Sequence, residues 1–184
     1  MKESKNPSAI RSKKEITSAL YKLMEIYPYN EISVKQIVME TGLVRKTFYR
    51  NFDSKDDVLN SYINEKIVEY TDALLEKPED PLAVIFDYCD KNRDLLMLLH
   101  KNNMLPILLV RLNAQIPEIG KTTNSDLNPF CKLYGEMMPD YLIAFNVGAI
   151  FNVIFKWVDR GMVEPLGNVR ELIGEYFQRL KSTY

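Results

Sequence analysis

The sequence predicts an all-α protein with a small N-terminal helical domain, a long linking helix and a larger C-terminal helical body. Apolar residues recur three and four positions apart along most of the chain, which is the spacing of helices with one buried face. Gly and Pro stand mainly between these periodic stretches, where helices end. With 184 residues, of which 46% are hydrophobic, the chain is long enough to bury a core. We place the domains at residues 1–54, 55–76 and 77–184.

Charge is unevenly distributed along this chain, although the net charge is only −1. Residues 1–55 carry eleven Lys and Arg against six acidic residues, whereas the rest carries 13 against 19. A basic N-terminal third on an acidic body is typical of a nucleic-acid-binding domain attached to a body that does not bind nucleic acid.

A first helix is expected from about Ser8 to Tyr27, because Pro28 blocks its continuation. Cations crowd its N-terminal end, where they are unfavourable against the helix dipole unless an anion lies nearby. These cations are Arg11, Lys13 and Lys14, and the apolar stripe of the helix is Ile16, Ala19, Leu20, Leu23 and Met24.

Residues 33–52 predict two short helices joined by a tight turn. Ser33 can cap the first helix, and Val34, Ile37 and Val38 form its apolar face. Gly42 ends this helix because glycine adopts a positive φ angle without steric cost.

The second short helix is basic and is expected to direct its polar groups outward. A short helix of this kind, braced by an apolar helix across a glycine turn, is suited to enter a DNA major groove, where Arg and Lys reach guanine or phosphates. The alternative is a solvated basic face on an ordinary helical hairpin. The outward residues are Arg45, Lys46, Tyr49 and Arg50.

The run TGLVRKTFYRNFDSKDDVLNSYI, from Thr41 to Ile63, resembles the DNA-binding signature of the TetR (tetracycline repressor) family of transcriptional regulators. The matching positions are Gly42, Thr47, Phe48, Tyr49, Phe52, Ser54, Lys55, Asp56 and Leu59. The resemblance implies that Thr47, Tyr49 and Lys55 contact DNA phosphates, and that Val44, Arg45 and Lys46 face base edges. It also brings the start of the first helix, with its three cations, close to a phosphate; a solvated charged turn is the alternative there.

Three features depart from the family pattern. Val44 stands where the family has a small capping hydroxyl, so the second helix must begin with another cap or with water on its first N–H groups. Asn51 replaces the usual His, and Tyr27-Pro28-Tyr29 replaces a Gly-aromatic turn.

The remaining chain predicts further helices and no second DNA-binding motif. The linking helix runs from about Lys55 to Leu75 and is ended by EKPEDP at residues 76–81. Residues 118–128 form the most loop-like stretch of the body. The other expected helices are Leu82–Cys89, Arg93–Lys101, Met104–Gln115 ending near Pro117, Pro129–Met138, Asp140–Arg160 and Val169–Lys181.

The last two helices resemble the C-terminal part of a TetR subgroup common in Gram-positive bacteria, where two such helices pair with their two-fold mates in a dimer. The alternative is that the apolar faces of these two helices pack only into the core of a single chain. The candidate interface residues are Leu142, Phe145, Gly148, Ala149, Asn152, Val153, Leu172, Ile173, Tyr176, Phe177 and Leu180.

Apolar and aromatic residues of the body are candidates for a pocket that binds a small apolar or aromatic effector, although each fits plain core packing. They are Phe86, Tyr88, Met97, His100, Met104, Tyr134, Met137, Met138, Phe151 and Phe155. Cys89 and Cys131 lack a CxxC spacing and are expected to be reduced, buried thiols; a disulfide or redox switch is the alternative. We expect no metal site and no cofactor.

The sequence favours a cytoplasmic homodimer that binds a palindromic operator in double-stranded DNA and regulates transcription, as a repressor, under the control of a small effector. The alternative is the same DNA-binding domain with a body that binds a protein partner and acts as an activator. An enzyme is disfavoured because the chain has no phosphate-binding glycine loop, no HExxH and no nucleophile elbow. A structural interaction module would show no salt-dependent affinity for DNA. Polar residues interrupt the longest apolar stretch, so no membrane association is expected.

Overall fold

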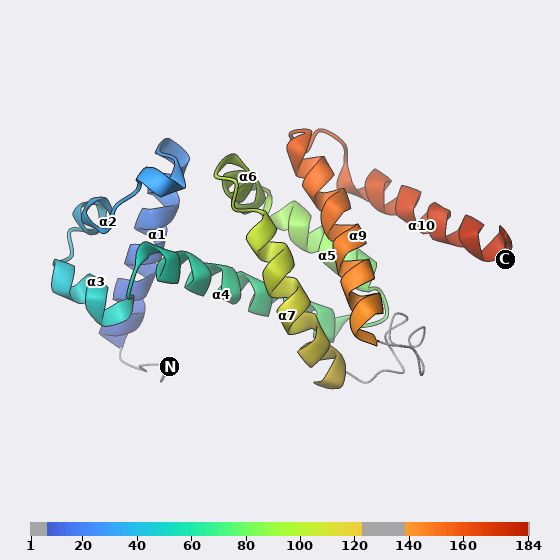
Figure 1. The fold of residues 1–184 in the computed structure, drawn as a ribbon, viewed down its shortest axis with the longest axis horizontal. Coiled ribbons are helices and arrows are strands. Elements are labelled where there is room, and N and C mark those ends of the chain that lie inside the picture. Colours follow the sequence, from blue (N-terminus) through green and yellow to red (C-terminus); the bar gives the residue numbers. More distant parts are fainter. Residues whose placement is uncertain (1–6, 123–138, 184) are drawn as a thin grey trace. The chain divides into compact units, whose positions relative to one another are not determined.

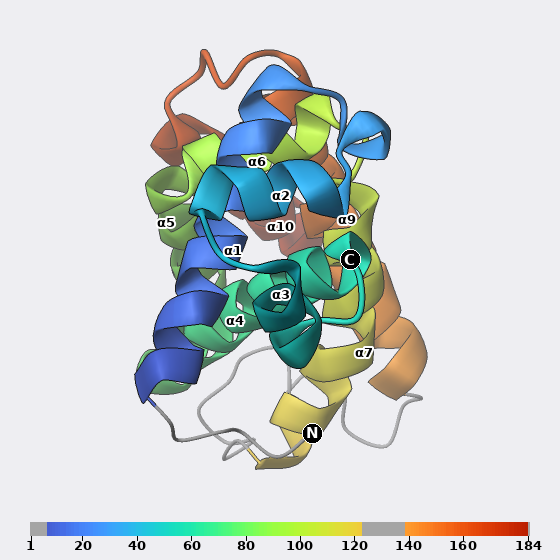
Figure 2. The same ribbon diagram turned by 90° about the vertical axis from the view of Figure 1, so that its left-hand side faces the viewer.

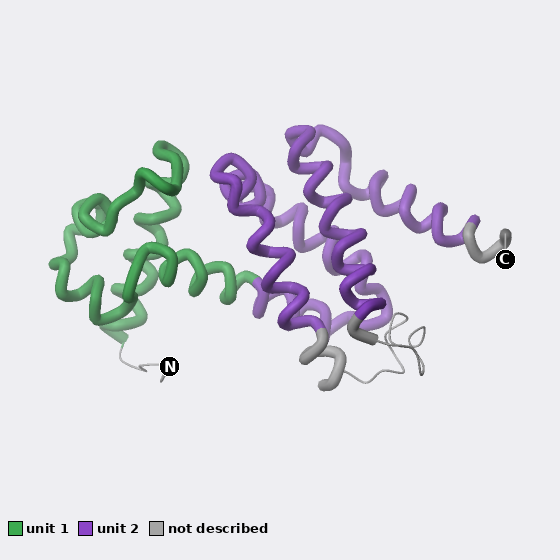
Figure 3. Tube along the Cα trace, in the orientation of Figure 1, with its two compact units in different colours: residues 1–66 green, residues 67–184 purple. Residues whose placement is uncertain are grey.

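The computed structural model describes residues 7–122 and 139–183. All regular structure in these two ranges is helical, as predicted (Figure 1). The chain divides into two compact units, residues 1–66 and 67–184 (Figure 3). The expected linking helix is α4 (Lys55–Glu76), and the division between the units falls inside it.

Unit 1 is built around its first helix, which packs against both of the short helices that follow (Figure 2). The predicted apolar stripe of this helix is buried at every position. Ile37, Phe48, Val58 and Ile63 contribute fully buried side chains from the other helices. The elements are α1 (Pro7–Ile26), the short 3-10 helix η1 (Tyr29–Glu31), α2 (Val34–Thr41), α3 (Arg45–Asn51) and the first part of α4.

The turn between α2 and α3 has the local structure that the sequence predicts. The Ser33 hydroxyl accepts a hydrogen bond from the Gln36 backbone N–H, and the Gln36 side chain accepts one from the Ser33 N–H at 2.8 Å. This reciprocal pair satisfies two N–H groups that a helix start leaves open. Gly42 ends α2 with a φ of 68°, in the left-handed region that favours glycine.

Unit 2 contains the rest of α4 and the helices α5 (Pro81–Lys91), α6 (Arg93–Lys101), α7 (Pro106–Thr122), α9 (Pro139–Asp159) and α10 (Leu166–Thr183). Within it, α9 packs against α6 and α7, and α10 packs against α5. One part of its core joins α4 to α5 through Tyr70, Leu74 and Val84, with Leu112 and Ile116 of α7 packed against them.

Two predicted helix boundaries in this unit differ from the structure by three residues or more. The third body helix was expected to end near Pro117, but α7 continues to Thr122, so residues 118–122 are helical. A proline inside a helix removes only one backbone hydrogen bond, so the helix can continue past Pro117, and α7 as a whole is supported by packing against α9. The last helix begins at Leu166, before the expected Val169, because the Leu166 side chain is buried there. The expected helix at residues 129–138 lies outside the described residues.

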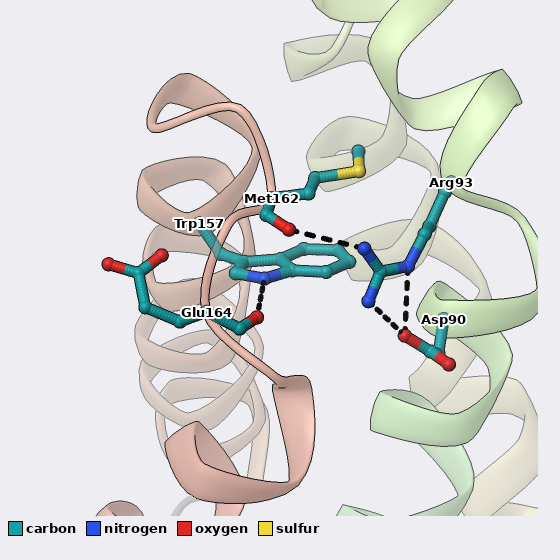
Figure 4. Close-up of polar contacts among 5 residues, drawn as sticks. All are labelled: Asp90, Arg93, Trp157, Met162 and Glu164. Carbon is teal, nitrogen blue, oxygen red and sulfur yellow. Dashed lines mark hydrogen bonds and ion pairs between the residues drawn. The ribbon is translucent and has the colours of Figure 1, made fainter.

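Side chains of α9 and of α6 hold the turn between α9 and α10 in place (Figure 4). Trp157 donates its indole N–H to the Glu164 carbonyl oxygen at 2.9 Å. Arg93 donates to the Met162 carbonyl oxygen at 3.2 Å and to Asp90 Oδ1 from both Nε and Nη2. These contacts hold the chain reversal that places α10 beside α5.

Candidate nucleic-acid interface

Helix α3 presents the outward surface that the sequence predicts. Arg45, Lys46, Tyr49 and Arg50 are exposed, whereas Phe48 is 0% exposed and anchors the helix to the core. An exposed, basic, short helix held by one buried aromatic side chain has the chemistry needed for base edges and phosphates in a major groove. The expected residue Thr47 is half-buried on the same helix.

The start of α3 has no side-chain cap. Val44 is the N-cap residue, with φ −79° and ψ 146°, and its side chain makes no capping hydrogen bond. The side chain is 67% exposed immediately before the first helical residue. An apolar group at this place can contact a thymine methyl group.

Arg45 and Tyr49 contact each other across one turn of α3. Arg45 Nη2 donates to the Tyr49 hydroxyl oxygen at 3.2 Å, and the guanidinium carbon lies 5.4 Å from the centroid of the Tyr49 ring. The sequence prediction treated these residues separately, although their spacing of four positions is the signal for contact on a helix surface.

Asn51 holds the C-terminal end of α3. Its side chain is 8% exposed and donates from Nδ2 to the Thr47 carbonyl oxygen at 2.7 Å. This departure from the family pattern therefore places a satisfied polar group inside the unit, where it closes the last turn of the helix.

Lys55 is tied to the turn that connects α1 and α2. Its Nζ donates to the carbonyl oxygens of Tyr29 and Ile32, each at 2.7 Å, and of Asn30 at 3.2 Å. These three bonds use the donor capacity of an ammonium group. The nitrogen also lies 4.6 Å from the centroid of the Tyr29 ring. In this structure Lys55 therefore braces the first turn of α4, a role that sequence reasoning missed.

The Tyr29 side chain adds a second link between the α1–α2 turn and the start of α4. It is buried, and its hydroxyl donates to the Asp56 carboxylate. Burial, followed by the bond to Asp56, raises the pKa of the Tyr29 phenol above its ordinary range. The Tyr27-Pro28-Tyr29 segment that departs from the family pattern is thus built into the start of α4.

The three cations at the start of α1 have different surroundings. Arg11 is exposed and pairs with Glu15 at 2.8 Å. Lys13 lies with its Nζ 5.9 Å from the centroid of the Phe52 ring, at the end of α3, and Lys14 is exposed. Lys13 therefore brings positive charge from α1 to the helix that carries the candidate base contacts.

The candidate dimer residues whose side chains are described are all exposed or half-buried on α9 and α10, and we call them the apolar surface of unit 2. Phe145 is 68% exposed on α9, and Leu172 is 67% exposed on α10. Among the described residues, the helical stretch 141–159 is long and apolar enough to cross a membrane, by length and composition only. Only 17% of the most apolar 18-residue segment of this stretch is buried inside the protein. Ala149, Asn152, Tyr176 and Phe177 are also exposed, Leu142, Gly148, Val153 and Ile173 are half-buried, and the side chain of Leu180 lies outside the described set.

The structure brings three candidate effector residues together. His100 meets Phe155 edge-on with 5.6 Å between ring centroids, and Phe155 lies 6.2 Å from Phe151. Tyr88 instead lies 5.6 Å from the ring of Tyr70. Of the other candidates, Phe86 is buried, Met97 is exposed, Met104 is half-buried, and Tyr134, Met137 and Met138 lie outside the described residues.

Comparison with known proteins supports the assignment of the N-terminal unit. Residues 16–62 match the family model for "Bacterial regulatory proteins, tetR family". No curated protein matches the chain. The matched segment contains all of η1, α2 and α3, together with the brace formed by Tyr29 and Lys55.

Two solved structures share the fold over nearly the whole chain. One is described as "Dihydroxyacetone kinase operon activator DhaS", with a TM-score of 0.64, 18% identity, and coverage of 95% of this chain and 98% of that one. The other is the fatty acid degradation regulator FadR from Bacillus halodurans, with a TM-score of 0.60, 20% identity, and coverage of 94% and 95%.

Proposed function

We propose, on the premise that residues 16–62 form the DNA-binding domain of the tetR family of bacterial regulatory proteins, that the chain is a homodimeric, sequence-specific regulator of transcription. The observation that carries the proposal is the exposed, basic face of α3 on a buried aromatic anchor. We propose that it acts in the cytoplasm, where it binds duplex DNA. The C-terminal resemblance to a Gram-positive subgroup is part of the proposal.

In this proposal α3 lies in the major groove. Arg45, Lys46 and Val44 face base edges, because the N-terminal residues of a recognition helix make these contacts. Thr47 and Tyr49 contact phosphates, and so do the exposed cations at the start of α1. For Lys55 we propose bracing of α4 in place of a phosphate contact, since its three donors are engaged by backbone carbonyl oxygens.

We propose that a second copy of the chain packs against the apolar surface of α9 and α10. The large exposed side chains of Phe145, Leu172 and Tyr176 support this proposal, because exposed apolar surface often marks an interaction site. Two copies are also required by the function, because two recognition helices must reach successive major grooves about 34 Å apart. A two-fold dimer would place the same surface of each copy against the other.

The proposed output is repression, relieved by a small apolar or aromatic effector in unit 2. The aromatic group of His100, Phe151 and Phe155 supports a site of that chemistry. An effector acts if it binds one arrangement of the dimer more tightly than another. Activation through a protein partner is the second candidate, and the fold shared with a structure described as an operon activator favours it.

The test is a mobility shift of the purified full chain on DNA from the region upstream of its own gene, at two salt concentrations and with unrelated competitor DNA. We expect binding that resists the competitor and is lost in the double variant Arg45→Ala, Lys46→Ala. The matched control removes two exposed lysines of unit 2, as Lys77→Ala, Lys91→Ala, and should bind like the wild type. Equal, weak binding to all DNA would refute the proposal. Transcription from the bound promoter in vitro then separates repression from activation.

A further inference from the structure

We infer that Tyr49 is a positioning residue that holds Arg45 in the orientation in which it reads a base, so that Tyr49 sets sequence specificity through Arg45. This inference rests on the proposed function, because it concerns how α3 discriminates between base pairs. It assigns Tyr49 more than the phosphate contact that the family resemblance implies.

The first observation is the double contact between the two side chains. The Tyr49 hydroxyl accepts from Arg45 Nη2 at 3.2 Å, and the guanidinium faces the Tyr49 ring at 5.4 Å from its centroid. A hydrogen bond and a cation–π contact from one side chain restrict a guanidinium at two points. Both residues lie on α3, so the contact moves with the helix as a unit.

The second observation is that Tyr49 is itself held by the core. Its ring meets Phe48 edge to face, with 5.3 Å between centroids, and Phe48 is 0% exposed. Tyr49 is 46% exposed, so about half of the residue is covered by the protein, and its hydroxyl contacts Arg45. A line of contacts thus runs from the buried Phe48 through Tyr49 to Arg45.

The polarity of the hydrogen bond leaves both residues able to bind DNA. Because the Tyr49 oxygen accepts from Arg45, the phenolic hydrogen is free to be donated to a phosphate oxygen. Arg45 commits one N–H group and keeps the others for guanine O6 and N7. A phosphate contact made by Tyr49 would therefore fix the position from which Arg45 approaches its base.

Loss of this support should weaken discrimination more than overall affinity. A free arginine side chain loses rotamer freedom when it binds, and holding it in advance removes that cost. The advantage applies only where Arg45 meets its preferred base. We therefore expect Tyr49→Phe to reduce the preference at the Arg45 base pair by about threefold to tenfold, and Tyr49→Leu, which also removes the ring, by more.

The experiment selects bound duplexes from a random-sequence pool with the wild-type chain and with Tyr49→Phe, Tyr49→Leu, Arg45→Ala and Arg45→Ala, Tyr49→Phe. The preference at each base pair of the selected site is then measured by competition. We expect Arg45→Ala to abolish preference at one position of each half-site and Tyr49→Phe to lower it at that same position. In the Arg45→Ala background, Tyr49→Phe should cause no further loss of preference.

The control is Tyr27→Phe, which removes the hydroxyl of another exposed tyrosine in unit 1 and should leave every preference unchanged. Uniform weakening by Tyr49→Phe on all sequences, with preferences unchanged, would show a phosphate contact alone and overturn the inference while the proposed function stands. A wild-type chain that selects no sequence would overturn both. Unchanged thermal unfolding of Tyr49→Phe would confirm that the effect on preference does not arise from instability.

Discussion

The guanidinium of Arg93 lies 4.9 Å from the centroid of the Trp157 ring, although the two residues belong to helices far apart in the sequence. Arg93 also donates to the Met162 carbonyl oxygen and to Asp90, so it joins the start of α6 to the turn after α9 (Figure 4). Trp157 is buried beneath it. An arginine that stacks on an indole and binds a carboxylate uses properties that lysine does not share.

Replacing this arginine should destabilise unit 2. We expect Arg93→Ala to lower the free energy of unfolding by about 2 kcal/mol, through loss of the stacking and of charge-assisted hydrogen bonds. Arg93→Lys should recover only part of this, since it cannot make the same forked contacts. Urea unfolding measures the effect. Lys91→Ala, at an exposed neighbouring position, is the control, and an Arg93→Ala variant as stable as that control would contradict the prediction.

Replacing Lys55 should separate bracing from phosphate binding. We expect Lys55→Met to lower the stability of the chain and its DNA affinity, while the slope of log affinity against log salt concentration stays unchanged. A lost phosphate contact would instead reduce that slope by about 1. Lys14→Met, at an exposed candidate phosphate contact, should show the reduced slope. Measuring DNA affinity at several salt concentrations distinguishes the two roles. A reduced slope for Lys55→Met would contradict this prediction and show that Lys55 contacts a phosphate.

A charge on the apolar surface of unit 2 should dissociate the proposed dimer. Phe145→Glu would bury an unpaired carboxylate in each copy, and we expect the dimer dissociation constant to rise about 100-fold or more. Analytical ultracentrifugation measures it. Val163→Glu places the same charge at an 80% exposed residue outside this surface and should leave the dimer intact. If the wild-type chain sediments as a monomer at micromolar concentration, the second-copy proposal fails.

A capping residue at the start of α3 should stabilise the helix and alter what it reads. Val44→Ser supplies the missing hydroxyl at an N-cap with extended backbone angles, and we expect a gain of about 1 kcal/mol. Loss of the exposed valine should at the same time weaken any preference for thymine at the adjacent base pair. Thermal unfolding and site selection test the two effects, and Val44→Ala serves as the control that removes the apolar group without adding a cap.

The buried Cys89 thiol should be unreactive in the folded chain. Burial, with a smaller effect of Asp90, raises its pKa to about 12, so almost no thiolate is present at pH 8. In a Cys131→Ser variant, alkylation should require unfolding. Because the unfolded chain loses this proton at a lower pH, the contribution of Cys89 to stability is present below about pH 8.5 and is lost as the pH rises towards 12. Rapid alkylation of the native variant at pH 8 would contradict this prediction.

Local features of unit 1 could be predicted because they depend on the spacing of apolar residues and on helix caps, which a short stretch of sequence contains. The spacing of the apolar residues in α1 identified its buried face, and Ser33 and Gly42 identified the ends of α2. Val44 indicated that α3 lacks the family's hydroxyl cap, and the structure shows no side-chain cap in its place. Each of these depends on neighbours within about one helical turn.

Tertiary structure decided the features that depend on partners distant in sequence. Lys55 could be named as a cation, but only the fold places it against three backbone carbonyls of the α1–α2 turn. Helix α7 continues beyond Pro117 to Thr122 and packs against α9, and no local pattern gives that packing. Sequence by itself thus determined an all-α chain with a helix-turn-helix, since periodicity and caps act locally. The side-chain partners and the apolar surface left open on α9 were decided by the tertiary structure, because burial depends on which helices meet.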